Sequence, residues 1–207
     1  MTETVVGAAA GIVKCEHRKA AIIGTGPGRR SAPWGDLSWC KWAINEIWQP
    51  ELDRHYELHP MSVQSERDLA WLAQCPTPCY VLNLAECDGK VKNAVQYPIQ
   101  RVLAMPGARD WFTSTFSYQV ALAILDGFEE IGLWGVDLRL GSPREQTVEW
   151  AGLSWWLGYA AGRGMKVTLD GDYTWTHPGR YGYDYHYEKY AVERQMRAMR
   201  DAFLSHG

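Results

Sequence analysis

Residues 24–28, which read Gly-Thr-Gly-Pro-Gly, are the part of the sequence whose types could most directly bind a ligand. They follow the short apolar run 20–23, and an apolar run bounded by turn residues is typical of a buried strand. Glycine lets the backbone approach a ligand, and N–H groups in such a turn can bind phosphate oxygens. We therefore expect Gly24, Thr25, Gly26 and Pro27 to contact a nucleotide, with a plain tight turn as the alternative.

The same loop departs from two known phosphate-binding motifs. The dinucleotide fingerprint needs a third glycine at the position of Arg29 and an acidic residue after the next strand, where Asn45 stands. The lysine of a P-loop is also missing. A nicotinamide enzyme is therefore disfavoured. The amide of Asn45 offers both a donor and an acceptor, so it could read a base or a ribose edge, or it could be a turn residue that bonds its own backbone.

Three consecutive hydroxyl residues, Thr113, Ser114 and Thr115, stand just before a predicted helix over residues 115–126. The amino-terminal end of a helix carries partial positive charge, so hydroxyls there suit a phosphate or a carboxylate. Simple capping of the helix is the alternative for one or two of them.

Residues 170–187 are rich in glycine, tyrosine, tryptophan and histidine and have no period, which indicates a lid or binding loop. Histidine can take a proton near neutral pH, and tyrosine can donate to a departing phosphate oxygen. We expect catalytic roles for His177, His186 and Tyr185, unless they are solvated loop residues. His59, which follows a predicted strand at the edge where the ligand should lie, is a competing candidate.

No metal or cofactor is expected in the reading that the residues favour. The cysteines lack zinc-finger spacing. Asp170 and Asp172 have the spacing of two carboxylates that could hold Mg²⁺ beside a pyrophosphate, although Asp-Gly-Asp is also an ordinary turn.

Short apolar runs alternate with helical patterns along the chain. Strands are predicted at 20–23, 54–58, 79–82, 131–136 and 165–169, and helices at 65–74, 115–126 and 147–161, while 39–44 fits either type. This alternation predicts an α/β, Rossmann-like domain with a mostly parallel sheet flanked by helices, whose strands all end at one edge.

The chain is expected to form one domain in four parts: an arm (1–18), a nucleotide-binding core (19–169), a lid (170–187) and a C-terminal helix (188–207). Val192, Met196, Met199 and Phe203 form an apolar stripe on that helix, which packs on the core or joins a homodimer.

Composition narrows the function classes. A net charge of −3 disfavours a protein that coats nucleic acid. The chain has 11 Trp and 11 Tyr, aromatic residues with a polar group, which suit a cleft that is apolar on one side and in contact with water or a ligand on the other. The sequence shows neither a basic secretory leader nor a membrane-length apolar run, so we expect a cytoplasmic protein without membrane contact.

Several runs together resemble a known group: IIGTGPGRR, WAINEIW, HYELHP, YVLN and FTSTFSYQVALAILDGFEEIGLWGVDL. They are similar to uncharacterised phage-encoded proteins, and through these to family 42 sialyltransferases and 6-hydroxymethylpterin diphosphokinase-like proteins. The similarity covers roughly residues 20–169 and is most specific from Thr113 to Asp137.

The sialyltransferase resemblance implies that residues 24–27 flank the donor phosphates and that Asn45 contacts the nucleotide or its sugar. It also implies hydroxyls near the transferred group at 113–115 and a catalytic His and Tyr on the lid. Asp137, which closes the predicted strand 131–136, is expected at the donor site as well. The usual Gly-Pro-Ser is Gly-Pro-Gly here, because Gly28 replaces the serine.

These observations predict a glycosyltransferase that moves a sugar from a nucleotide-linked donor to a hydroxyl of a glycan, a small molecule or a modified base in phage DNA. A nucleic-acid acceptor would need a local basic patch. One alternative is Mg²⁺-dependent pyrophosphoryl transfer, with Asp137, Asp170 or Asp172 as ligands. The other is a phage protein that binds a nucleotide without catalysis. A phage protein would act in the host cytoplasm.

Overall fold

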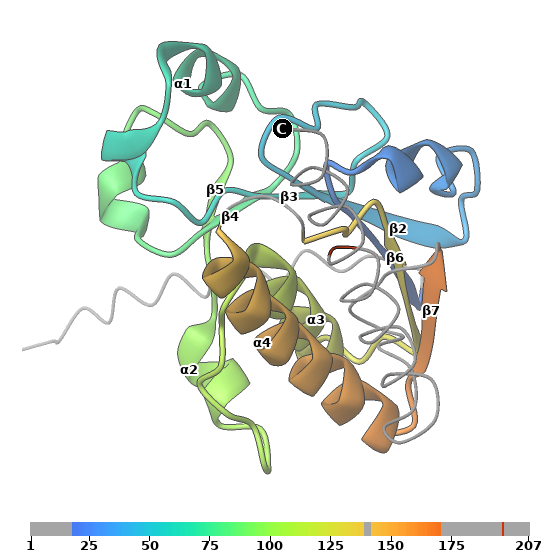
Figure 1. Ribbon diagram of the computed structural model, residues 1–207. Helices are drawn as coiled ribbons and strands as arrows, with labels where there is room; N and C mark the ends of the chain where they lie inside the picture. The colour runs from blue at the N-terminus through green and yellow to red at the C-terminus, as the bar shows by residue number, and fades with distance from the viewer. Residues whose placement is uncertain (1–17, 139–141, 171–195, 197–207) are drawn as a thin grey trace, which may run out of the picture. The chain divides into compact units, whose positions relative to one another are not determined.

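The computed structural model describes residues 18–138, 142–170 and 196 (Figure 1). The chain divides into two compact units, Met1–Gly171 and Asp172–Gly207, and apart from Met196 all described residues lie in the first. The predicted lid beyond Asp170, and the rest of the C-terminal helix with Val192, Met199 and Phe203, fall outside the described residues.

A seven-stranded sheet with the order β5-β4-β3-β2-β1-β6-β7 forms the centre of the first unit. Every pairing of neighbouring strands is parallel, which confirms the predicted α/β fold with a mostly parallel sheet. The strands are β1 (Lys19–Ile23), β2 (Trp39–Ile44), β3 (Arg54–Tyr56), β4 (Cys79–Val81), β5 (Ala94–Gln96), β6 (Glu130–Trp134) and β7 (Lys166–Asp170).

The ambiguous segment 39–44 is strand β2, and all six of its residues are buried. It is the central strand of the order and lies beside β1, whose residues 20–23 are fully buried. A parallel sheet covered on both faces favours continuous apolar runs over alternation, which explains why the periodicity of this segment did not reveal its type.

Four α-helices and three short 3₁₀ turns connect the strands. The helices are α1 (Glu66–Leu72), α2 (Ile99–Leu103), α3 (Thr115–Leu125) and α4 (Pro143–Gly162), and the turns are η1 (Pro27–Ser31), η2 (Met61–Val63) and η3 (Leu84–Cys87). Helices α3 and α4 lie side by side (Figure 1), with α3 against β1 and α4 against β7. None of the described helices combines the length and apolar character that crossing a membrane requires.

Helices α1 and α3 cover opposite faces of the sheet, as the alternation along β3 shows. Arg54 points to the α3 side, where its Nη1 donates a 2.6 Å hydrogen bond to Oδ2 of Asp126, the C-cap of α3. The next residue, His55, points the other way and contacts the ring of Trp71 on α1, with centroids 4.7 Å apart. Both faces of the sheet are therefore covered at β3, whose three residues are buried.

Helix α4 begins at Pro143, four residues before the predicted start. Ser142 and Glu145 form a capping box, in which each side chain bonds the other residue's backbone N–H. The S-x-x-E signature of such a box was present in the sequence and marks the start of the helix. Strand β5 and helix α2 were not predicted, because three and five residues are too few to show a period.

The connections that leave β1 and β6 diverge. From β1 the chain leads to β2 and the strands beyond it, whereas from β6 it leads through α4 to β7 on the other side of β1. Such a reversal opens a crevice beyond the carboxyl ends of the two strands, and this crevice is where ligands bind in open parallel sheets.

Candidate functional site

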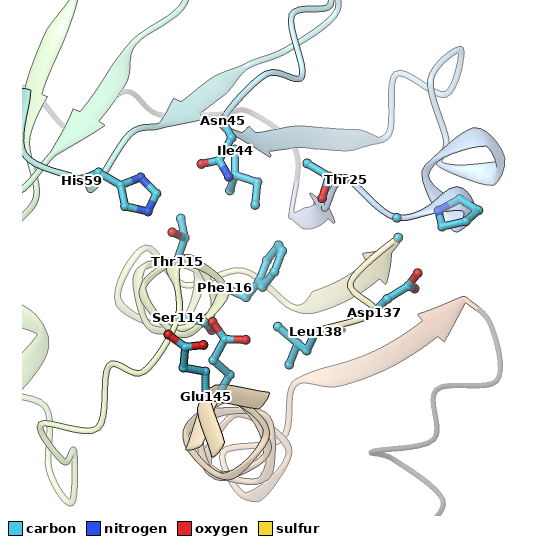
Figure 2. A pocket seen from close by; sticks show the side chains of 14 residues that line it. Thr25, Ile44, Asn45, His59, Ser114, Thr115, Phe116, Asp137, Leu138 and Glu145 are labelled. Carbon is cyan, nitrogen blue, oxygen red and sulfur yellow. The ribbon is translucent and has the colours of Figure 1, made fainter. Parts of the chain in front are cut away.

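A cavity of about 580 Å³ lies at the carboxyl edge of the sheet (Figure 2). Its size falls within the ~300–1,000 Å³ of small-molecule sites. It is lined by the loops after β1, β2, β3 and β6, by the first turn of α3, and by the first two turns of α4. The residues are Thr25, Gly26, Pro27, Ile44, Asn45, His59, Ser114, Thr115, Phe116, Gly135, Asp137, Leu138, Glu145 and Glu149.

The cavity brings together eight of the ten residues that the sequence predicted for nucleotide or donor binding. These are Thr25, Gly26, Pro27, Asn45, His59, Ser114, Thr115 and Asp137. The other two, Gly24 and Thr113, do not line it.

The glycine loop after β1 lies directly against the loop after β6. The N–H of Gly24 donates to the carbonyl of Trp134 at 2.8 Å, and the N–H of Gly26 donates to the carbonyl of Gly135 at 2.9 Å. A Cβ on Gly26 would lie 2.5 Å from Oδ2 of Asp137. Gly135 itself has a φ of +64°, which favours glycine. Gly24 therefore supports the loop, whereas Gly26 forms the wall of the cavity.

The amino-terminal end of α3 faces the cavity without a side-chain cap. Ser114 is the N-cap residue, but its side chain makes no capping hydrogen bond, and the first turn holds no acidic residue. Its Oγ lies 3.5 Å from Oγ of Ser117. In contrast, α1 and α4 are capped by Ser65 and Ser142 and carry acidic residues in their first turns. The end of α3 is therefore a donor-rich wall whose own first turn carries no acidic side chain, although Glu145 and Glu149 of α4 line the same cavity.

Thr113 instead joins α3 to α4. Its Oγ1 donates a 3.4 Å hydrogen bond to the carbonyl of Glu149 and packs against Gly152, which has no side chain at that contact. Of the three predicted hydroxyls, Ser114 and Thr115 are thus the two that reach the cavity.

Asn45 follows the last residue of β2 and has a φ of +48°, a left-handed conformation that asparagine adopts more readily than most residues. Its Oδ1 is buried and has no hydrogen-bond partner among the described residues. A strained residue with an unpaired polar atom, both at the wall of one cavity, is typical of a ligand-binding position.

His59 points into the cavity from the loop after β3 (Figure 2). Its Nδ1 lies 2.7 Å from Oε1 of Glu57, and its backbone N–H donates to the same oxygen at 3.2 Å. The Glu57 side chain is only 5% exposed, whereas that of His59 is 56% exposed. The hydrogen bond from the imidazole to this carboxylate raises the pKa of His59 above its usual value.

Two glutamates of α4 form the opposite wall. Hydrogen bonds from Ser142 lower the pKa of Glu145, whereas burial and the neighbouring charge of Glu145 raise the pKa of Glu149. The sequence analysis missed both residues: the predicted helix began after Glu145, and it contained Glu149 without singling it out as a site residue. The capping-box signature starting at Ser142 was the signal that could have found the first of them.

Potential metal ligands are dispersed in the described residues, where no three His, Cys, Asp or Glu side chains gather around a common point. Asp137 lines the cavity. Asp170 ends β7, and its Oδ2 accepts a hydrogen bond from Oγ of Ser31. Asp172, His177, Tyr185 and His186 lie outside the described residues.

Neither a family model nor a curated protein sequence matches the chain. Among solved structures, the sialyltransferase CstII from Campylobacter jejuni in complex with the substrate analogue cytidine-5'-monophosphate is similar. It is 13% identical, with 73% of this chain and 79% of that chain covered and a TM-score of 0.50. The same enzyme in complex with CMP-3FNeuAc matches at 13% identity and the same coverage, with a TM-score of 0.47. The first comparison shows that the two proteins share a fold, which confirms the predicted resemblance to sialyltransferases at the level of architecture.

Proposed function

We propose that this protein binds a nucleotide-activated sugar in the 580 Å³ cavity and transfers the sugar to a hydroxyl acceptor. One observation carries the proposal: the uncapped end of α3 at Ser114 and the glycine loop at Gly26 line the same cavity at the β1/β6 crevice. The N–H groups at the start of α3 suit the phosphate of a nucleotide, and Gly26, whose own N–H is bonded to Gly135, lets the ligand approach the backbone closely.

The phosphate belongs between the glycine loop and the end of α3. Positive helix ends stabilise anions, and the hydroxyls of Ser114 and Thr115 add hydrogen-bond donors there. The glutamates of α4 would repel a phosphate placed beside them, but they can accept hydrogen bonds from sugar hydroxyls. Carboxylates lie at both ends of the cavity, since Asp137 stands beside Gly26, so we place the phosphate by the N–H groups at the start of α3 and the sugar beside Glu145 and Glu149.

The nucleoside would extend toward Asn45. The unpaired Oδ1 of that residue can accept a hydrogen bond from an amino group or a ribose hydroxyl. The neighbouring Ile44 offers an apolar contact for a ring. The solved structure that shares this fold binds cytidine-5'-monophosphate, which makes a cytidine nucleotide the first ligand to test.

In the reaction, the acceptor hydroxyl attacks the anomeric carbon while the bond from that carbon to the phosphate oxygen breaks. A base must take the hydroxyl proton, and donors must stabilise the negative charge that grows on the leaving phosphate. The end of α3 supplies the second function. For the base we retain His177 and His186, with Tyr185 as a donor to the leaving group, as predicted from the sequence.

The test is turnover of a panel of CMP-, UDP- and GDP-sugars, followed by chromatography of the released nucleotide, with and without EDTA. We expect one donor class to release its nucleotide at a rate that EDTA leaves unchanged. A rate abolished by EDTA would instead support pyrophosphoryl-type chemistry with Asp137 as a metal ligand. Binding of nucleotides without any turnover would support the non-catalytic alternative, and an absence of binding would contradict the proposal.

A further inference from the structure

A second cavity of about 400 Å³ adjoins the first at Thr25, Asn45 and His59, which line both. It extends between the loops after β2 and β3 and helix α1. Its remaining lining residues are Glu46, Trp48, Glu57, Gln64, Asp68, Trp71 and Leu72. Two substrates bound in these cavities would therefore meet at the three shared residues.

The wall of the second cavity is unsuited to phosphate. Among the described residues that line it, three carry carboxylates, Glu46, Glu57 and Asp68, and none is a lysine or an arginine. Carboxylates repel phosphate but accept hydrogen bonds from hydroxyls. Both cavities are lined by three carboxylates, but only the first contains the start of helix α3, so only the first offers helix N–H groups to a phosphate.

One of these carboxylates, that of Asp68, has an oxygen that accepts no hydrogen bond from the described residues. Oδ2 of Asp68 accepts a 2.6 Å hydrogen bond from Oγ of Ser65. Its Oδ1 is buried and accepts no hydrogen bond from the described residues, although Nη2 of Arg67 lies 3.7 Å from it. A buried acceptor without a hydrogen bond is costly, and a ligand hydroxyl would satisfy it.

The aromatic part of the wall is a stacked pair of indole rings. The rings of Trp48 and Trp71 stack with their centroids 5.3 Å apart and their planes at 14°. The ring of His55 contacts Trp71 in addition. An aromatic wall beside hydrogen-bonding side chains is the usual composition of a specific small-molecule site.

His59 stands where the cavities join, and Glu57 fixes its tautomer. Because Nδ1 bonds the carboxylate of Glu57, the neutral ring carries its proton on Nδ1 and offers the lone pair of Nε2. A base held by a second group in this way is the arrangement that activates a hydroxyl in enzymes.

We propose that the second cavity binds a polyhydroxylated acceptor, such as a sugar, and that Nε2 of His59 takes the proton of its attacking hydroxyl. The oxygen then forms a bond to the anomeric carbon of the donor, the bond from that carbon to the phosphate oxygen breaks, and the nucleotide leaves with the electron pair. This inference rests on the proposed function for its donor. It assigns the role of base to His59 in place of His177 or His186.

The other titratable side chains that line the two cavities are acidic in the part of the chain that the structure describes. They are Glu57 on its own loop, Glu46 after β2, Asp68 on α1, Asp137 after β6, and Glu145 and Glu149 on α4. They favour the protonated imidazole, so the rate should fall as the pH decreases through a pKa above that of an ordinary histidine. Replacing Glu57 by glutamine removes the largest contribution and should move this fall to lower pH.

The binding part of the test uses NMR spectra of the full chain labelled with ¹⁵N. CMP is added first, and then the methyl glycosides of glucose, galactose and mannose. We expect CMP to shift the amides of Gly26 and Ser114, and at least one glycoside to shift the indole N–H signals of Trp48 and Trp71. Asp68→Asn should weaken the glycoside effect at least about fivefold. If CMP binds but no glycoside shifts either indole N–H signal, the acceptor site alone is overturned. If CMP shifts no signal, the proposed function itself is contradicted.

The kinetic part uses the donor that turns over and the glycoside that binds. His59→Gln should lower kcat about 100-fold or more while the KM of the donor changes less than threefold. Glu57→Gln should lower kcat less than His59→Gln does, and it should move the acid limb of the pH profile to lower pH. Glu129→Gln, on an exposed pair at the opposite edge of the sheet, is the control and should change neither. The assignment would be overturned if His59→Gln kept both the kcat and the acid limb of the pH profile while the double variant His177→Asn/His186→Asn lost its activity and that acid limb.

Discussion

The backbone N–H of Gly26 donates a 2.9 Å hydrogen bond to the carbonyl of Gly135, so the loops after β1 and β6 are joined at the wall of the cavity. A Cβ on Gly26 would lie 2.8 Å from that carbonyl oxygen and 2.5 Å from Oδ2 of Asp137. Real side chains do not approach backbone this closely. Any side chain at residue 26 must therefore displace one loop from the other.

The first prediction follows from this contact. Gly26→Ala should destabilise the fold by about 1–3 kcal/mol, the usual cost of overpacking, and should weaken nucleotide binding. Urea unfolding and a calorimetric titration with CMP measure the two effects. Gly35→Ala is the control, since nothing lies within 4 Å of a Cβ there. Equal behaviour of the two variants would show that the loop contact does not shape the site.

The second prediction separates stability from binding with two serines at helix starts. Ser142 caps α4 in a capping box, so Ser142→Ala should cost about 1 kcal/mol of unfolding free energy and leave CMP affinity unchanged. Ser114 makes no capping bond, so Ser114→Ala should change stability by only a few tenths of a kcal/mol but weaken CMP binding. Thermal unfolding with and without CMP reports both quantities. The reverse pattern would mean that Ser114 serves the helix and not a ligand.

The third prediction concerns the buried ion pair between the sheet and α3. Arg54 is 1% exposed and Asp126 is 5% exposed, and the guanidinium also lies 4.4 Å from the ring centroid of Trp42. Asp126→Asn should destabilise the protein by about 3–5 kcal/mol, because it removes the carboxylate that pairs with a buried cation. The exposed pair of Arg18 and Glu129 is the comparison, and Glu129→Gln should cost less than about 1 kcal/mol. Urea unfolding of both variants measures the two losses in unfolding free energy and shows whether the buried pair contributes more than the exposed one.

The fourth prediction is a dependence of stability on pH that originates in His55. Burial lowers the pKa of this residue to about 4, and neither ring nitrogen has a hydrogen-bond partner among the described residues. The unfolded chain takes up a proton near pH 6.5 but the folded chain does not, so stability should fall as the pH decreases from about 6.5 toward 4, by about 3 kcal/mol.

His55→Phe keeps an aromatic ring against Trp71 and removes the titrating group. As the pH decreases from 6.5 to 4, the stability of this variant should therefore rise relative to that of the wild type. Above pH 7 the difference between the two should stay constant. Urea unfolding at several pH values measures it. A difference that does not depend on pH would show that His55 is not buried in its neutral form.

Much of the fold could be predicted from local patterns. The strands at 20–23, 79–82 and 131–136 were visible as apolar runs between turn residues, and the helix at 115–126 by its apolar residues and Gly127. Gly127 does end that helix with a φ of +77°. The elements that escaped prediction are either too short for a period, such as β5, or apolar on both faces, such as β2.

The candidate site was predictable where chemistry and position coincide. The glycines, Asn45, His59 and Ser114 all stand at the end of a strand or the start of a helix, so the parallel topology alone brings them to one edge. The pairing of His59 with Glu57 was not predictable, because it depends on how a loop turns after β3. The second cavity likewise arises from the packing of α1, which no local pattern encodes.

A crystal structure of the protein with CMP tests the central claim most directly. The account predicts the phosphate within about 3 Å of the backbone N–H groups at the start of α3 and beside Gly26, with Asn45 against the nucleoside. A nucleotide bound elsewhere on the chain, or an empty cavity at millimolar CMP, would contradict it.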